Sequence, residues 1–216
     1  MNNDPLFLLM VSAVGLYVAT LWRADYRNAL AGRSSPVALP GATPVPAQAC
    51  LVAALGGLVL TLLETWGEIQ LGLSAEQSQM TVLFGGYTLL AAFIEELVFR
   101  GFIVIEGRGA TAKWAGAFGA SVLFAVLHPF LWTLDLGAAP FWKIWEWEWN
   151  WAWKLNLKGW FSTVAVFAAS LWFYAMRFTV RLNPRGSLLP SFAAHGAKNL
   201  AVFAIKAAQG FVVGAW

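Results

Sequence analysis

Residues 93–102, FIEELVFRGF, set two adjacent glutamates and an arginine inside an otherwise apolar run of the sequence. Charged side chains are costly inside a bilayer, so those found in a membrane-spanning segment mark a functional site by default. On a helix, Glu96 and Arg100 share a face because they are four residues apart, and they can form an ion pair. Glu95 points about 100° away around the same helix. We therefore expect Glu96 and Arg100 to neutralise each other, and Glu95 to face a neighbouring helix as a general base acting on water.

The composition of the whole chain is that of a membrane protein. Of its 216 residues, 59% are hydrophobic and only 12% are charged, and the mean hydropathy is +0.64. Soluble domains carry about a quarter charged residues, so a soluble domain is excluded. The net charge of +3 is too small and too scattered to indicate nucleic-acid binding. The single cysteine, Cys50, excludes an intrachain disulfide.

Six segments are apolar and long enough to cross a bilayer as helices, which takes about 20 residues. We therefore expect an all-α polytopic integral membrane protein, a single membrane domain over residues 1–216 with an intramembrane active site. The first segment has neither a basic leader nor a cleavage site, so we expect it to be a retained helix. The expected spans are 5–22, 49–73, 80–104, 114–134, 160–178 and 187–206.

The distribution of lysine and arginine predicts the orientation. Loops 23–48, 105–113 and 177–186 contain eight of these residues, and the regions on the opposite side contain three. Because cytoplasmic loops carry the excess of positive charge, we expect the first set of loops in the cytoplasm and both termini outside. The expected location is the bacterial inner (plasma) membrane.

Two loops have a distinctive composition. Residues 35–48, SPVALPGATPVPAQ, are proline-rich and predict an extended cytoplasmic linker. Residues 142–154, WKIWEWEWNWAWK, place tryptophan at every second position. Tryptophan favours the membrane–water interface, so we interpret this loop as an interfacial anchor. A lid or a substrate ramp over the outer mouth of the site is the alternative.

Both histidines of the chain lie within predicted spans. His128 is followed by Pro129, which predicts a kink in the fourth helix. His195 and Asn199 share one helix face, and both can donate to an oxygen. At about 1.5 Å per residue, Glu95, His128 and His195 lie within about 10 Å of one another in depth. A buried Glu–Arg clamp and a His–Asn hydrogen bond between helices are the structural alternatives to catalysis.

These residues form three short motifs, EExxxR at 95–100, FxxxH at 124–128 and HxxxN at 195–199. In this order and on separate helices, the motifs resemble those of the CPBP family. This family comprises CAAX-prenyl endopeptidases of the Rce1 type and bacterial bacteriocin-processing or immunity (Abi) proteins. The resemblance places a catalytic core at residues 80–206.

The resemblance implies a glutamate-type intramembrane endopeptidase that cleaves a membrane-anchored protein or peptide, such as a CAAX-like, leader or C-terminal sorting segment. It implies that Glu95 and His128 hold and activate the attacking water. It further implies that His195 and Asn199 stabilise the tetrahedral oxyanion. The residues expected to support the site are Glu96, Arg100 and Phe124.

Several alternatives stay open at this stage. Zinc could be held by Glu95, His128 and His195, but no HExxH spacing is present, so we expect no metal cofactor. The expected partners are the lipid bilayer and the membrane-anchored substrate. A non-proteolytic immunity or scaffold protein is one alternative function. A proton-coupled transporter is another, because of the ionisable residues Glu64, Glu68, Glu95, Lys198 and Lys206.

Overall fold

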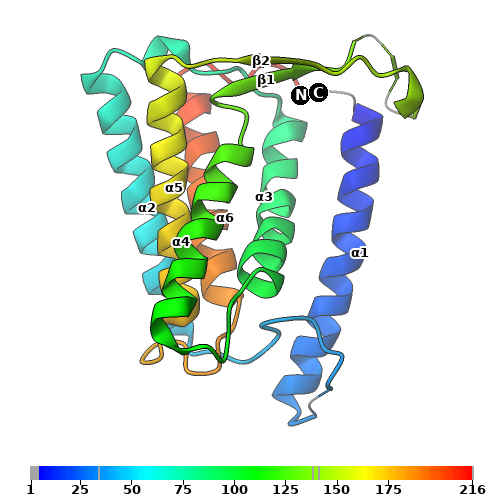
Figure 1. Cartoon of the computed structure of the whole chain (residues 1–216), viewed down its shortest axis with the longest axis vertical. Helices are drawn as coiled ribbons and strands as arrows, with labels where there is room; N and C mark the ends of the chain where they lie inside the picture. Colours follow the sequence, from blue (N-terminus) through cyan, green and yellow to red (C-terminus); the bar gives the residue numbers. More distant parts are fainter. Residues whose placement is uncertain (1–4, 34, 138, 141, 216) are drawn as a thin grey trace.

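The computed structural model describes residues 5–33, 35–137, 139–140 and 142–215. In this part of the chain, six long α-helices run up and down as a bundle (Figure 1). A short antiparallel hairpin lies at one end of the bundle, where the first helix begins and the last helix ends. The helices are α1 (Pro5–Leu30), α2 (Ala47–Gln70), α3 (Val82–Glu96), α4 (Gly109–Leu127), α5 (Leu157–Phe178) and α6 (Leu189–Ala208).

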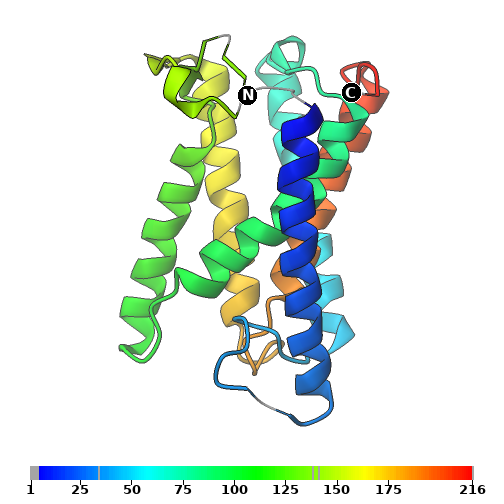
Figure 2. The ribbon, with the colours of Figure 1, turned by 90° about the vertical axis from the view of Figure 1, so that its right-hand side faces the viewer.

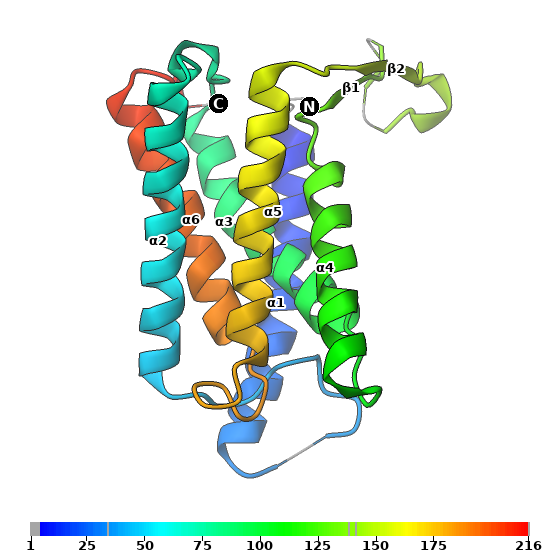
Figure 3. The same cartoon turned by 60° about the vertical axis from the view of Figure 1, so that its left-hand side comes forward.

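Five of these helices are long and apolar enough to cross a membrane. They are α1, α2, α4, α5 and the helix formed by α3 and its continuation to Phe102. The sixth helix, α6, contains His195, Lys198 and Lys206, and it is not apolar enough to count among the candidate membrane spans. It packs against α2, α3 and α5, so its polar groups lie against protein (Figure 3). The prediction of a polytopic helical membrane protein is confirmed.

The helix that carries the two glutamates changes geometry directly after them. Thr81 begins α3 by accepting a hydrogen bond from the Phe84 amide at 3.2 Å. After Glu96, residues Leu97–Phe102 form a π-helix, η2. Such π-helical turns are rare and occur often at functional sites. Figure 2 shows α3 and η2 crossing the bundle obliquely towards α4.

The prediction that a kinked helix would continue to residue 134 is wrong. Helix α4 ends at Leu127, and His128 adopts an extended backbone with φ −72° and ψ 130°. Proline disfavours the helical conformation in the residue before it, and here the helix ends at this point and does not bend. Strand β1 (Trp132–Asp135) follows within five residues.

The tryptophan-rich loop contains strand β2 (Asn150–Trp153), which pairs antiparallel with β1. The sequence did not predict this small sheet. Trp132 pairs with Trp153 in the register, and the rings of Trp132 and Trp151 stack with centroids 4.5 Å apart. Two short 3-10 helices complete the elements, η1 (Ser74–Glu76) and η3 (Ile144–Glu146).

The proline-rich linker is docked on the bundle and is not a free extended chain, so this prediction is also corrected. The indole of Trp22 donates to the Pro40 carbonyl at 3.0 Å, and the Leu188 amide donates to the Gly41 carbonyl at 3.0 Å. Gly41 has a φ of +64°, and a Cβ there would lie 2.5 Å from the Leu188 side chain. The linker therefore holds α1 against the start of α6.

Candidate active site

The expected ion pair between Glu96 and Arg100 is present and completely buried. Nη1 of Arg100 lies 3.1 Å from Oε1 of Glu96, and both side chains are 0% exposed. The second guanidinium nitrogen donates to the backbone carbonyl of Ser170 at 3.2 Å and to its hydroxyl. Ser170 in turn donates to the Ser121 hydroxyl at 2.9 Å. A continuous polar chain therefore links α3, η2, α5 and α4.

Aromatic rings enclose the arginine on several sides. Its Cζ atom lies 4.6 Å from the ring centroid of Phe124, 4.7 Å from that of Tyr174 and 5.2 Å from that of Phe173. Cations are attracted to the faces of such rings, most strongly where water is excluded. The Tyr174 hydroxyl also donates to the Phe99 carbonyl at 2.6 Å, inside the π-helix. Arg100 is thus fixed in place by rings as well as by hydrogen bonds.

His195 lies between the two glutamates. Its Nδ1 atom is 2.8 Å from Oε1 of Glu96, and its Nε2 atom is 3.7 Å from Oε2 of Glu95. A carboxylate oxygen only accepts, so Nδ1 carries a proton and donates it to Glu96. Glu96 therefore orients His195 in addition to neutralising Arg100, a role that the sequence analysis did not include.

The two adjacent glutamates have different environments. The side chain of Glu96 is 0% exposed, whereas that of Glu95 is 34% exposed. Glu96 is occupied by Arg100 and His195 and has no access to an incoming molecule. Glu95 retains open surface next to the His195 ring. The arrangement provides one carboxylate for support and one for chemistry.

The second motif joins the site through the ring of Phe124. This ring lies 4.7 Å from the His128 ring and 6.0 Å from the His195 ring, measured between centroids. Nδ1 of His128 lies 2.7 Å from the Phe124 carbonyl, which can only accept. The proton of a neutral His128 is therefore on Nδ1, and Nε2 presents a lone pair. Such a nitrogen can accept a hydrogen bond from water.

Asn199 is placed one helical turn beyond His195 on α6. Its side-chain amide donates to the Thr88 carbonyl of α3 at 2.9 Å. This bond uses one of the two N–H groups of the amide and fixes the direction of the other. The three motifs thus come from α3 with η2, from the end of α4, and from α6, as the sequence spacing predicted.

The remaining ionisable groups of α2 and α6 have partners on other elements. Lys198 pairs with Glu64, and Lys158 pairs with Glu68. Lys206 donates to the Ser78 hydroxyl at 3.0 Å. Buried charges are tolerated when they are paired and hydrogen-bonded. These contacts account for the lysines and glutamates of α2 and α6 as links between elements.

The zinc site that the sequence offered as an alternative would use Glu95, His128 and His195. Among the residues that the structure describes, no group of three or more His, Cys, Asp or Glu side chains is placed to hold a metal ion. His195 directs Nδ1 to Glu96, and His128 directs Nδ1 to a backbone carbonyl.

Sequence reasoning missed the hydroxyl groups that support the arginine. Ser121 and Ser170 are both 0% exposed, and Phe173 stacks on His195 with centroids 4.8 Å apart. Serine and phenylalanine are ordinary residues of apolar helices, so no local signal marked these positions. Only the packing of α4 against α5 shows their role.

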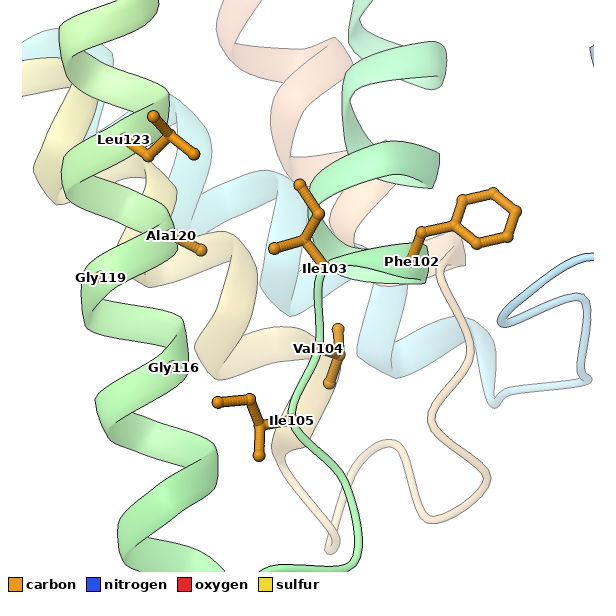
Figure 4. Close-up of a pocket in the computed structure, with 8 residues that line it drawn as sticks. All are labelled: Phe102, Ile103, Val104, Ile105, Gly116, Gly119, Ala120 and Leu123. Atoms are coloured by element: carbon orange, nitrogen blue, oxygen red, sulfur yellow. The ribbon is translucent and has the colours of Figure 1, made fainter.

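A pocket of about 490 Å³ lies beside the site, between α4 and the residues that follow η2 (Figure 4). Its lining is apolar and includes none of the motif residues. It is formed by Phe102, Ile103, Val104, Ile105, Gly116, Gly119, Ala120 and Leu123.

A family model described as type II CAAX prenyl endopeptidase Rce1-like matches residues 77–201, more than half of the chain. The matched region begins just before α3 and includes all three motifs. In general terms, it supports a CAAX-type intramembrane endopeptidase. Comparisons with curated proteins and with solved structures returned no match.

Proposed function

Because the chain belongs to the type II CAAX prenyl endopeptidase Rce1-like family, we propose that it hydrolyses a peptide bond within the membrane by a glutamate-activated water. One observation carries the proposal. Glu95 is half-buried and accessible, and it lies 3.7 Å from a histidine that a fully buried Glu96–Arg100 pair orients. This arrangement holds a reactive carboxylate beside a donor ring at a fixed geometry.

In the proposed mechanism, Glu95 and His128 bind the attacking water. The water donates one hydrogen to the carboxylate of Glu95 and the other to Nε2 of His128. As its oxygen bonds to the scissile carbonyl carbon, Glu95 takes up the proton. The same proton passes to the leaving nitrogen when the C–N bond breaks. General acid–base transfer of this kind contributes about 10²–10⁴-fold to a rate.

His195 and Asn199 stabilise the negative oxygen of the tetrahedral intermediate. Nδ1 of His195 stays bonded to Glu96, so Nε2 is the nitrogen that can donate towards this oxygen when it carries a proton. Asn199 donates through the N–H that Thr88 does not use. Removing one such donor from an enzyme typically lowers kcat about 10²–10³-fold.

The proposed substrate is a membrane-anchored protein or peptide. Glu95 lies within the segment Val82–Phe102, which is long and apolar enough to span the membrane, so a substrate must reach it at the depth of the bilayer. A CAAX-like, leader or C-terminal sorting segment meets this requirement. Water-soluble peptides do not.

The test uses purified protein in liposomes together with a panel of membrane-anchored peptides of these three types. Fragments are identified by mass spectrometry. We expect cleavage of at least one type, and we expect Glu95→Gln and His128→Ala each to abolish it. The matched control is Glu76→Gln, which removes an exposed glutamate outside the helical spans and leaves cleavage unchanged.

Full cleavage by a folded Glu95→Gln variant would refute the mechanism. The same inactive variant also serves to identify the natural substrate, because it binds without releasing products. Membrane proteins retained by Glu95→Gln, and not by the wild-type protein, are the expected substrates.

A further inference from the structure

The tryptophan arm, which we define as β1, β2, the described residues between them, and Lys154, takes no part in the proposed hydrolysis. It contains a large share of the tryptophans of the chain, and several are strongly exposed. The exposed fractions are 74% for Trp145, 67% for Trp149 and 65% for Trp153. Aromatic surface of this extent facing water would be unfavourable, so a partner covers it.

The position of the arm identifies that partner. It connects the end of α4 to the start of α5, and both helices are apolar and long enough to cross the membrane. The base of the arm therefore lies where the hydrocarbon core ends. Figures 1 and 3 agree that the arm runs across the helix axes and extends sideways beyond the bundle. A segment in this place lies over lipid and not over the rest of the protein.

The chemistry of the arm fits the membrane–water interface. Tryptophan combines a large apolar ring with one N–H donor and is enriched at the level of the lipid headgroups. Polar groups alternate with the rings: Lys143 pairs with Glu146 at 3.0 Å, and Asn150 donates to Glu148 at 3.3 Å. Such a mixture is too polar for the hydrocarbon core and too aromatic for water.

The net charge of the arm argues against binding through attraction to anionic lipids. Its two lysines, Lys143 and Lys154, stand against Asp135, Glu146 and Glu148, which gives a net charge of −1. Electrostatic attraction to acidic lipids needs clusters of basic residues. We infer that the tryptophan arm docks sideways into the headgroup region of the bilayer through its aromatic rings, independently of lipid charge.

The arm is also joined to the loop that holds His128. The Trp132 indole donates to the Val126 carbonyl at 2.7 Å, and the Lys154 amide donates to the Leu131 carbonyl at 2.7 Å. The first bond fixes the start of the arm to the last turn of α4, and the second fixes its end to Leu131, so both ends of the arm hold the loop at residues 128–131. An arm held at the membrane surface sets the depth of this loop.

The test measures the depth of spin labels in phosphatidylcholine vesicles, from their collisions with oxygen and with a water-soluble nickel complex. Cys50 is first replaced by serine. Labels are then placed singly at Trp145→Cys and Trp149→Cys. Two similarly exposed positions serve as references: Leu62→Cys on α2 for the acyl chains, and Val37→Cys in the linker for water.

We expect the arm labels to give depths between the two references, with nickel collisions several-fold fewer than at position 37. Added phosphatidylglycerol should leave these depths unchanged. In a variant with Trp145, Trp149 and Trp153 all changed to serine, a label at Ile144→Cys should shift to the value of the water reference.

Three results would overturn the inference. Arm labels that behave like position 37 would show that the arm stands in water. Labels shielded from both oxygen and nickel would show that a protein, such as a second copy of the chain, covers the rings. Depths that require phosphatidylglycerol would show that lipid charge, and not aromatic docking, holds the arm.

Discussion

Glu95 and Glu96 are neighbours in the sequence, yet their contacts assign them opposite tasks. Glu96 touches both Arg100 and His195 and has no exposed surface. Glu95 lies 3.7 Å from Nε2 of His195, and its side chain is partly exposed. A residue with two buried partners affects stability, because its removal leaves charges without compensation. A residue that is partly open can be changed at little structural cost.

The first prediction compares these two glutamates in unfolding experiments. Glu96→Gln keeps the volume of the side chain but leaves the Arg100 guanidinium buried without its carboxylate. We expect a loss of about 3–5 kcal/mol in the free energy of unfolding. Glu95→Gln should lose less than about 1 kcal/mol, as for exposed ion pairs. The measurement is the shift in the detergent-unfolding midpoint, and equal losses would contradict the assignment.

The second prediction concerns the hydroxyls behind the arginine. Ser170 accepts directly from Arg100, whereas Ser121 accepts a hydrogen bond from Ser170. We expect Ser170→Ala to lower the free energy of unfolding by about 1.5–3 kcal/mol, as for hydrogen bonds to charged groups. Ser121→Ala is the matched control and should cost about 0.5–1.5 kcal/mol. The reverse order would show that Arg100 does not depend on Ser170.

At the scale of elements, the apolar runs were sufficient to predict the helices, because crossing a bilayer needs a long apolar segment. The ends of these elements were harder. Pro129 marked the right position, but whether a helix bends or stops there depends on what the next residues contact. Here residues 132–135 find a strand partner in 150–153, far away in the sequence. Hydropathy does not contain that information.

The site was predictable to a similar degree. The spacing of Glu96 and Arg100 predicted their pairing. The depths of the two histidines predicted that they would lie at a similar level, and both rings lie near that of Phe124. The contact between Glu96 and His195 was not predictable, because it depends on how α6 rotates against α3. The same holds for Asn199, whose amide is directed by the Thr88 carbonyl.

The third prediction concerns the contact between α2 and α6, where Glu64 pairs with Lys198. Single changes to Glu64→Gln or Lys198→Met leave the other charge buried without its partner. Together they remove both charges. A double-mutant cycle should therefore give a coupling of about 0.5–3 kcal/mol. Glu64→Gln combined with Lys143→Met, a change on the exposed arm, is the control, and its effects should add.

At the scale of the whole molecule, the basic loops and the hairpin lie at opposite ends of the bundle (Figure 1). The linker at residues 35–48 and the loops after η2 and α5 share one end. The helices alternate in direction as the sequence predicted. The loops rich in lysine and arginine therefore lie at one end of the bundle, and the loops poor in them lie at the other (Figure 1). The positive-inside rule then predicts which surface faces the cytoplasm.

The fourth prediction tests this orientation by labelling single cysteines in cells with a maleimide that does not cross membranes. In a background in which Cys50 is serine, Val37→Cys lies at the basic end and Glu76→Cys at the hairpin end, and both positions are exposed. We expect intact bacterial cells stripped of their outer membrane to label position 76 only. Inverted membrane vesicles should label position 37 only. The opposite result would place the eight basic residues outside. It would also place the hairpin, the end of α4 and His128 in the cytoplasmic half of the membrane. A substrate would then have to approach the site from the cytoplasmic side.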